Sequence, residues 1–365
     1  GAGKSSLVII GTLVGVLLLM GGCMVVYRRP PRRLRRCSEM QHRLMFRLLG
    51  LGLIPKCKLL IAFYQSVQAL PKVYSVELPP EYYEWMQVVD WLELDWTALV
   101  VPGSCLGGGY LTRFLLKGLV PLGAMGVLLL AGVLFDASRA RAVPASGGAR
   151  TGPPPLWQGL LKTLPLVLFL SFFLCASVST SIFAAWSCVE FADDSSAGTR
   201  RYFLREDLST ECYGAEHDRI RASGYVLMVV WPIAMPLLYL LLLLPCRHAI
   251  WQKRPTSLVR ATAFLHREYL PACFWWEPIF LLQRLCISGF LQLIPDSHGF
   301  VRVLTGLMAT VLYLALLLAT QPYKRRDFNL LANAAQFALV CVFFGSVCMR
   351  LMQDLETVAL LDEET

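Results

Sequence analysis

The sequence predicts an all-α membrane protein: a polytopic bundle of about eight transmembrane helices with one amphipathic helix at the membrane interface. Of the 365 residues, 56% are hydrophobic and only 16% are charged, well below the ~25% of a soluble domain. Long apolar runs alternate with basic loops. This pattern is typical of membrane topology and not of a nucleic-acid-binding surface. The net charge of +9 therefore predicts the lipid bilayer as the partner, and no nucleic acid.

Residues 1–26 are predicted to form a short extracytoplasmic stub and the first membrane helix. The 20 residues from Leu7 to Val26 carry no charge and span about 30 Å as a helix, the hydrocarbon thickness of a bilayer. The preceding GAGKSS matches only the end of a phosphate-binding G-x-x-x-x-G-K-[ST] loop. Its first glycine and its strand would precede residue 1, so we favour the stub. Because the chain begins with Gly, we expect a fragment.

Residues 27–58 are predicted to form a basic cytoplasmic segment, because a dense run of arginines follows the first helix directly. Such a cluster binds anionic lipid headgroups at about 1 kcal/mol per residue. A plain orientation signal needs the same residues, so both roles stay open. The cluster comprises Arg28, Arg29, Arg32, Arg33, Arg35 and Arg36.

Residues 59–350 are predicted to hold the other seven membrane segments. Five are strongly apolar, at 114–135, 164–188, 225–244, 300–320 and 330–349. A shorter one covers 278–294, and a weak one covers 59–78, which contains Gln65, Gln68, Pro71 and Lys72.

Positive-inside counting gives these segments an orientation. With Gly1 outside, the cytoplasmic loops are 27–58, 136–163, 245–277 and 321–328. They hold ten, four, five and three Lys and Arg, which is 22 of the 34 in the chain. An even number of crossings must separate the basic loops 27–58 and 136–163, so the weak segment is needed. Both chain ends are then outside, with the plasma membrane favoured over internal membranes.

Two loops and the tail have distinct compositions. Residues 136–163 contain AVPASGGARTGPPP and are predicted to be a flexible linker. Residues 189–221 form a hydrophilic external loop bounded by Cys188 and Cys212, and residues 351–365 an acidic tail. In an oxidising compartment the two cysteines are candidates for a disulfide. The alternative is a free Cys188 buried at the end of its helix.

The stretch EYYEWMQVVDWLELDW at 81–96 is the predicted interfacial helix. Trp85, Val89, Leu92 and Trp96 repeat as one apolar stripe, and aromatic residues favour the membrane interface. The six carboxylates at 77–95 would concentrate cations at a pore mouth, or would form only a solvated face.

Two polar stripes inside predicted helices are the sharpest candidates for function. A charged side chain at membrane depth is costly and usually faces protein or water, so these faces would line an aqueous path. Interhelical hydrogen bonding explains them equally. Lys117 and Arg302 lie near helix ends, where they can snorkel to the interface. The candidate path comprises Arg284, Ser288, Gln292, Asn329, Asn333 and Gln336.

The sequence predicts no enzyme, cofactor or metal site. GSCLG at 103–107 imitates a nucleophile elbow but lacks a flanking strand and a recognisable base. The 12 cysteines form no C-x-x-C pair. No segment has the arginine spacing of a voltage sensor, and no loop has a TVGYG-like filter.

Three stretches carry a family resemblance: KCKLLIAFYQSVQALPKVYSVELPPEYYEWMQVVDWLELDW at 56–96, WSCVEFADDSSAGTRRYFLREDLSTEC at 186–212, and REYLPACFWWEPIFLLQRLCISGFLQLIP at 267–295. They resemble the polytopic, transient-receptor-potential-like region of large algal and oomycete membrane proteins with EGF-like or other cysteine-rich ectodomains. The resemblance implies an ectodomain upstream of Gly1 and further membrane sequence after the last helix.

The resemblance also implies a function. The expected activity is passive ion movement by a transient-receptor-potential-like channel or channel-related module, with homo-oligomers possible. The alternative is the membrane anchor and signalling region of a receptor or adhesion protein, and a transporter is third.

Overall fold

The computed structural model describes residues 53–74, 79–89, 109–142, 154–192, 200–295 and 298–363. Most of these residues are helical, as predicted. Within them, five helical segments are long and apolar enough to cross a membrane: Gly109–Ala140, Leu156–Ala184, Ala215–Trp251, Gly299–Thr320 and Arg326–Gln353. They correspond to the five strongly apolar segments of the sequence, and the expected total of eight is not reached. The first predicted helix and the arginine cluster lie outside the described residues.

The long helices begin before the predicted spans, and two of them also end after those spans. They are α6 (Gly109–Ala142), α7 (Pro155–Ala184), α14 (Gly299–Thr320) and α15 (Arg326–Glu363). The ends of the predicted linker at 136–163 are therefore helical, and residues 143–153 lie outside the described part. The beginning of the predicted acidic tail continues α15.

The third candidate span is a composite helix. It runs through α8 (Ala215–Met228), a π-helical turn η3 (Val229–Ile233), α9 (Ala234–Leu243), η4 (Leu244–Cys246) and α10 (Arg247–Trp251). Pro232 lies in the π turn. Proline lacks the N–H that an α-helix would need there, so the regular hydrogen-bond ladder is interrupted at this point.

The described residues of the two weaker predicted segments are also largely helical. α3 covers Leu53–Tyr74, and α13 covers Trp276–Ser288 before the 3₁₀ turn η6 (Phe290–Leu293). The 13 residues of α13 span only about 20 Å, less than the hydrocarbon thickness of a bilayer.

The chain divides into two compact units, which we call unit 1 (residues 1–54, 96–174 and 239–275) and unit 2 (residues 55–95, 175–238 and 276–365). In unit 1, α6 approaches the N-terminal part of α7 closely at Gly132 and Gly159. The rest of the described part of unit 1 includes short helices: α11 (Ser257–Ala261), α12 (Ala263–His266) and η5 (Pro271–Cys273).

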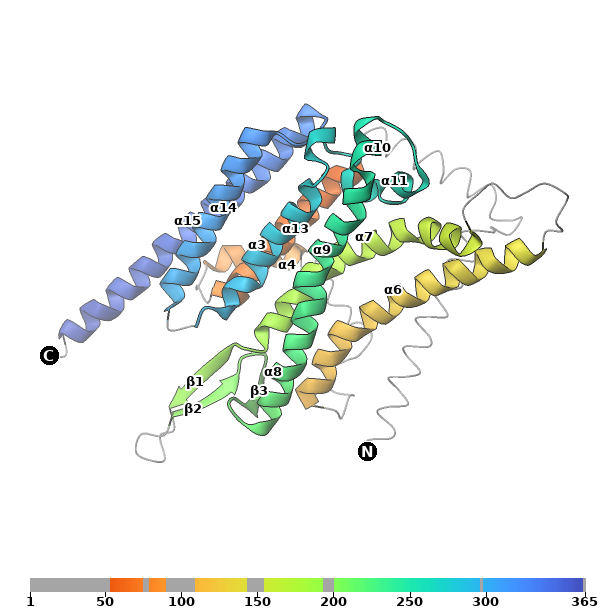
Figure 1. Ribbon diagram of the computed structural model, residues 1–365. Coiled ribbons are helices and arrows are strands. Elements are labelled where there is room, and N and C mark those ends of the chain that lie inside the picture. The colour runs from red at the N-terminus through yellow and green to blue at the C-terminus, as the bar shows by residue number, and fades with distance from the viewer. Residues whose placement is uncertain are drawn as a thin grey trace. The chain divides into compact units, whose positions relative to one another are not determined.

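Unit 2 is built around α3, α13, α14 and α15, and α14 and α15 lie side by side (Figure 1). Lys56 near the start of α3 pairs with Asp327 at the start of α15. Lys58 pairs with Glu277 at the start of α13. The first turns of α3, α13 and α15 therefore meet at one end of the unit, and these three helices run in the same direction.

The predicted external loop is more ordered than a plain loop. Three strands, β1 (Cys188–Ala192), β2 (Arg200–Leu204) and β3 (Asp207–Glu211), form an antiparallel sheet in sequence order. α8 already begins at Ala215, so the predicted loop 189–221 ends in a helix. The alternation of Val189, Phe191 and Phe203 with charged residues is the signal that would have indicated strands.

The first part of the predicted interfacial helix is α4 (Pro80–Val89). Trp85 is exposed, while Met86 is buried in the core that α3 shares with its neighbours. The Tyr82 hydroxyl donates to the Val67 carbonyl of α3 at 2.9 Å, and burial raises the pKa of this phenol. The predicted stripe positions Leu92 and Trp96 lie outside the described residues.

Candidate functional site

A ladder of two polar pairs joins α3 to α13 in unit 2. Lys58 Nζ donates to Glu277 Oε2 at 2.7 Å, and Glu277 is fully buried. Arg284 Nη2 donates to Gln65 Oε1. Seven residues separate Lys58 from Gln65, and seven separate Glu277 from Arg284, so the two parallel helices meet in register. Two turns of a helix return a side chain to nearly the same face, which explains the equal spacing.

Arg284 is the charged member of the second pair in this ladder. Its side chain is 2% exposed, and its guanidinium lies 6.0 Å from the centroid of the Phe280 ring. The amide that accepts from it is Gln65 of α3, which lies outside both predicted polar stripes. The signal for this partner was the polar character of segment 59–78, which also made that segment a weak membrane span.

The neighbouring residues of the predicted α13 stripe are buried, but they bond within their own helix. Ser288 Oγ donates to the Arg284 carbonyl at 2.8 Å, and Gln292 Nε2 donates to the Ser288 carbonyl at 3.2 Å. Each side chain thus donates to the carbonyl four residues earlier, as polar side chains in helices often do.

The three residues of the predicted α15 stripe differ in what they contact. Asn329 bonds both backbone groups of Tyr323, at 3.2 Å and 3.0 Å, and so closes the turn before the helix. Asn333 is half-buried, and its Oδ1 has no hydrogen-bond partner among the described residues. Gln336 is buried and donates to the Thr310 carbonyl of α14 at 3.1 Å.

A cavity of about 30 Å³ brings two of the predicted path residues together. Arg284 of α13 and Gln336 of α15 both line it, beside Gln283, Ser66 of α3 and Tyr313 of α14. Ser288, Gln292, Asn329 and Asn333 are not among its lining residues. Arg284 and Gln336 are therefore the part of the predicted path that shares one space.

The other end of unit 2 has its own buried arginine. Arg302 of α14 is 3% exposed. It donates to the Val73 carbonyl at 2.7 Å and to the Ile294 carbonyl. The prediction that Arg302 snorkels to the interface is wrong. The reason is that the last carbonyls of α3 and of the η6 segment lack partners within their own helices, and the guanidinium supplies donors to both.

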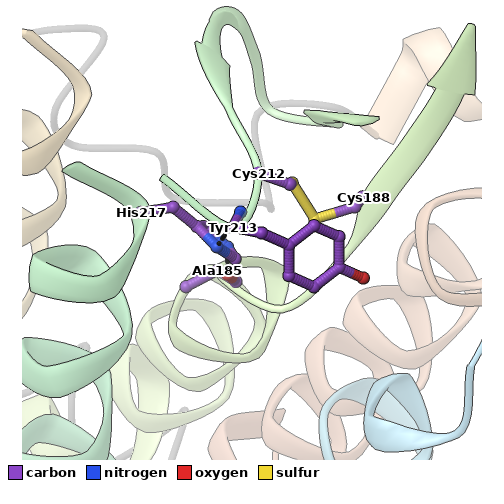
Figure 2. The surroundings of a disulfide bond; sticks show 5 residues. All are labelled: Ala185, Cys188, Cys212, Tyr213 and His217. Carbon is purple, nitrogen blue, oxygen red and sulfur yellow. Dashed lines mark hydrogen bonds between the residues drawn. A yellow bond between two sulfur atoms is a disulfide. The ribbon is translucent and has the colours of Figure 1, made fainter. Parts of the chain in front are cut away.

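The predicted cysteine pair closes the sheet module of unit 2. Cys188 at the start of β1 and Cys212 after β3 are joined by a disulfide, with a Cα–Cα distance of 6.5 Å (Figure 2). His217 in the first turn of α8 is buried beside them. Its Nδ1 accepts from the Tyr213 amide at 3.2 Å, and its Nε2 lies 3.1 Å from the Ala185 carbonyl.

The sulfur atoms and a ring nitrogen of Cys188, Cys212 and His217 lie within 4.8 Å of one another. A metal needs thiolates and a free imidazole nitrogen. Here the sulfurs bond each other and both ring nitrogens engage the backbone. The neutral tautomer with its hydrogen on Nε2 satisfies both contacts. The cluster therefore fastens the sheet to the ends of α7 and α8.

Comparisons with known proteins give one partial match. The chain is similar to "Cysteine repeat modular protein A" of Toxoplasma gondii, with 27% identity over 172 residues. The match covers 45% of this chain and 5% of that protein. No protein-family model matches the chain, and no solved structure matches it. The likeness to transient-receptor-potential-like proteins stays a prediction.

Proposed function

We propose that this chain is the membrane-embedded region of a much longer cysteine-rich protein, and that its helix bundle anchors that protein and couples it to the other side of the bilayer. The five apolar helices support the membrane location. The partial similarity to a protein named for cysteine repeats, of which this chain spans only 5%, supports a large extramembrane part.

The polar ladder between α3 and α13 is the main observation in favour of an anchor. Two of the polar groups that an ion path would need, Arg284 and Gln336, instead bond other helices of the same unit. The cavity that they share is small, about 30 Å³. These features favour a rigid, cross-linked anchor.

Reconstitution in planar bilayers tests this proposal. The purified chain should conduct no better than empty bilayers. A soluble reporter fused upstream of Gly1 should stay with membranes after alkaline carbonate extraction. Release of the reporter, or a robust current through the wild-type chain, would contradict the anchor.

A channel is the second candidate, because Arg284 and Gln336 line the same cavity. If this cavity belongs to a conducting path, Arg284→Leu should change conductance or ion preference while the yield of folded protein stays normal. Gln336→Cys should then react with a water-soluble thiol reagent. Phe337→Cys, on the exposed face of α15, is the matched control.

We also propose that the first turns of α3, α13 and α15 face the cytoplasm of a plasma-membrane protein. Their meeting at one end agrees with the predicted orientation, since the basic loops precede all three helices. Glycosylation acceptor sites inserted at 193–199 and at 143–150 test this arrangement. Modification of the 193–199 site alone is expected, and modification of the 143–150 site alone would refute it.

A further inference from the structure

The cavity of unit 2 has room for one small species. It lies between α3, α13, α14 and α15 and has a volume of about 30 Å³. A cavity of this volume admits water, and a monatomic halide is only slightly larger than a water molecule.

The polar lining favours a negative occupant. The Arg284 side chain is only 2% exposed, and its guanidinium is always charged. The adjacent Gln283 also lines the cavity. Its Nε2 is a buried donor with no hydrogen-bond partner among the described residues. Two residues of the cavity wall thus carry a full positive charge and an amide donor without a partner among the described residues.

The remaining walls strengthen this preference. Leu59 and Phe63 of α3, Phe280 of α13 and Leu339 of α15 are apolar, and electrostatic attraction is stronger in such a low-dielectric setting. The carboxylate of Glu277 does not line the cavity and is bonded by Lys58.

We propose that this cavity is a chloride-binding site in which Arg284 and Gln283 are the principal ligands. Such a site is compatible with either an anchor or a channel. Bound halide would draw α3, α13 and α15 together, since residues of all three helices surround it. A cation is disfavoured there because it would lie beside a buried guanidinium.

Thermal unfolding of the purified full chain in detergent provides the test. Sodium chloride, sodium bromide and sodium gluconate are compared at the same ionic strength. A ligand that binds only the folded state raises the melting temperature by mass action. Chloride and bromide should raise it by about 2–4 °C over gluconate. Equal melting in all three salts would mean that water alone fills the cavity, and would overturn the proposal.

Two variants and a matched control test whether the halide-dependent rise in melting temperature comes from this cavity. Gln283→Leu removes the amide donor and should abolish the halide shift, and it should fold because this side chain is only half-buried. Arg284→Gln removes the charge and should do the same. Gln292→Leu alters an amide outside the cavity that bonds its own helix, and should keep the full shift.

A second readout does not depend on stability. The line width of ³⁵Cl in NMR should broaden with wild-type protein and with Gln292→Leu, and should return to the detergent baseline with Gln283→Leu. A halide shift or line broadening that persists in Gln283→Leu would place the ion elsewhere and refute this site, even if Arg284→Gln fails to fold.

Discussion

The two units of this protein hold their helices together by different means. In unit 1, α6 and α7 approach each other through glycines. A Cβ atom added at Gly159 would lie 2.6 Å from the Gly132 carbonyl oxygen. In unit 2, α3, α13, α14 and α15 are joined by long polar side chains, and a disulfide closes the sheet module. Small residues let backbones approach, whereas polar side chains bridge a wider gap.

Because of this difference, the contacts of the two regions are not equally visible in the sequence. A polar side chain in an apolar segment is conspicuous, and Arg284 was singled out for that reason. A glycine in a membrane helix is ordinary, so the contact between Gly132 and Gly159 could not be predicted. The same unit also has polar pairs, between Lys162 and Asp136 at 3.1 Å and between the buried Ser171 and Tyr239 at 2.8 Å, so the difference between the units is one of degree.

The largest expected effect comes from breaking the buried ion pair of unit 2. Glu277→Leu leaves Lys58 facing an apolar site, and losing one partner of a buried pair costs about 3–5 kcal/mol. Reversible unfolding in mixed micelles measures this. The double variant Lys58→Met with Glu277→Leu should recover much of the loss.

Asp327→Asn is the matched control for that pair. Asp327 binds Lys56 at 2.9 Å, but both side chains are about one-third exposed, so the cost should stay below about 1 kcal/mol. If Glu277→Leu is no worse than Asp327→Asn, polar pairing does not distinguish unit 2.

The disulfide of unit 2 should have the next largest effect. Cys188→Ser opens a loop with a sequence separation of 24 residues, for which chain entropy gives about 3 kcal/mol. Hydrogen exchange of the β1, β2 and β3 amides should accelerate, because the sheet is no longer tied at both ends. Cys57→Ser changes an exposed free cysteine of α3 and should alter none of these rates. Alkylation of both Cys188 and Cys212 without reductant would show that the bridge is absent.

Close helix contact in unit 1 is tested by Gly159→Val. The new side chain would collide with the backbone of α6 around Gly132, and overpacking of this kind costs about 1–3 kcal/mol. The melting temperature and the yield of folded protein report it. Gly126→Val places the same side chain where nothing lies within 4 Å, and should be neutral. Equal melting of the two variants would rule out the glycine contact as a stabilising feature.

The smallest expected effect belongs to a single interhelical hydrogen bond. Gln336→Leu removes the bond to the Thr310 carbonyl, and such bonds contribute about 0.6 kcal/mol in membrane proteins. Phe337→Leu on the exposed face is the control for a change of side chain on α15. A loss of several kcal/mol with Gln336→Leu would show that the polar groups of unit 2 act as one network.

Much of the helical framework could be predicted. The five strongly apolar segments correspond to long helices, and the described part of the weak segment 59–78 is also helical. The contacts of the predicted path residues could not be predicted. The spacing of polar residues shows that their side chains share a helix face, but it does not show what they contact. Ser288 and Gln292 share the face of Arg284, yet they bond their own helix. The equal seven-residue spacing of Lys58 with Gln65 and of Glu277 with Arg284 was a usable signal that went unrecognised.

The sequence by itself determined where the long helices lie, because a lipid-exposed backbone must satisfy its hydrogen bonds within the segment and apolar length reveals such segments. The tertiary contacts, in contrast, show that Arg284 meets Gln65, that Arg302 binds two helix ends, and that the predicted external loop contains a sheet. Those contacts join residues far apart in the chain. They depend on how neighbouring helices are positioned along and around their axes, and the local pattern of a single helix does not specify that.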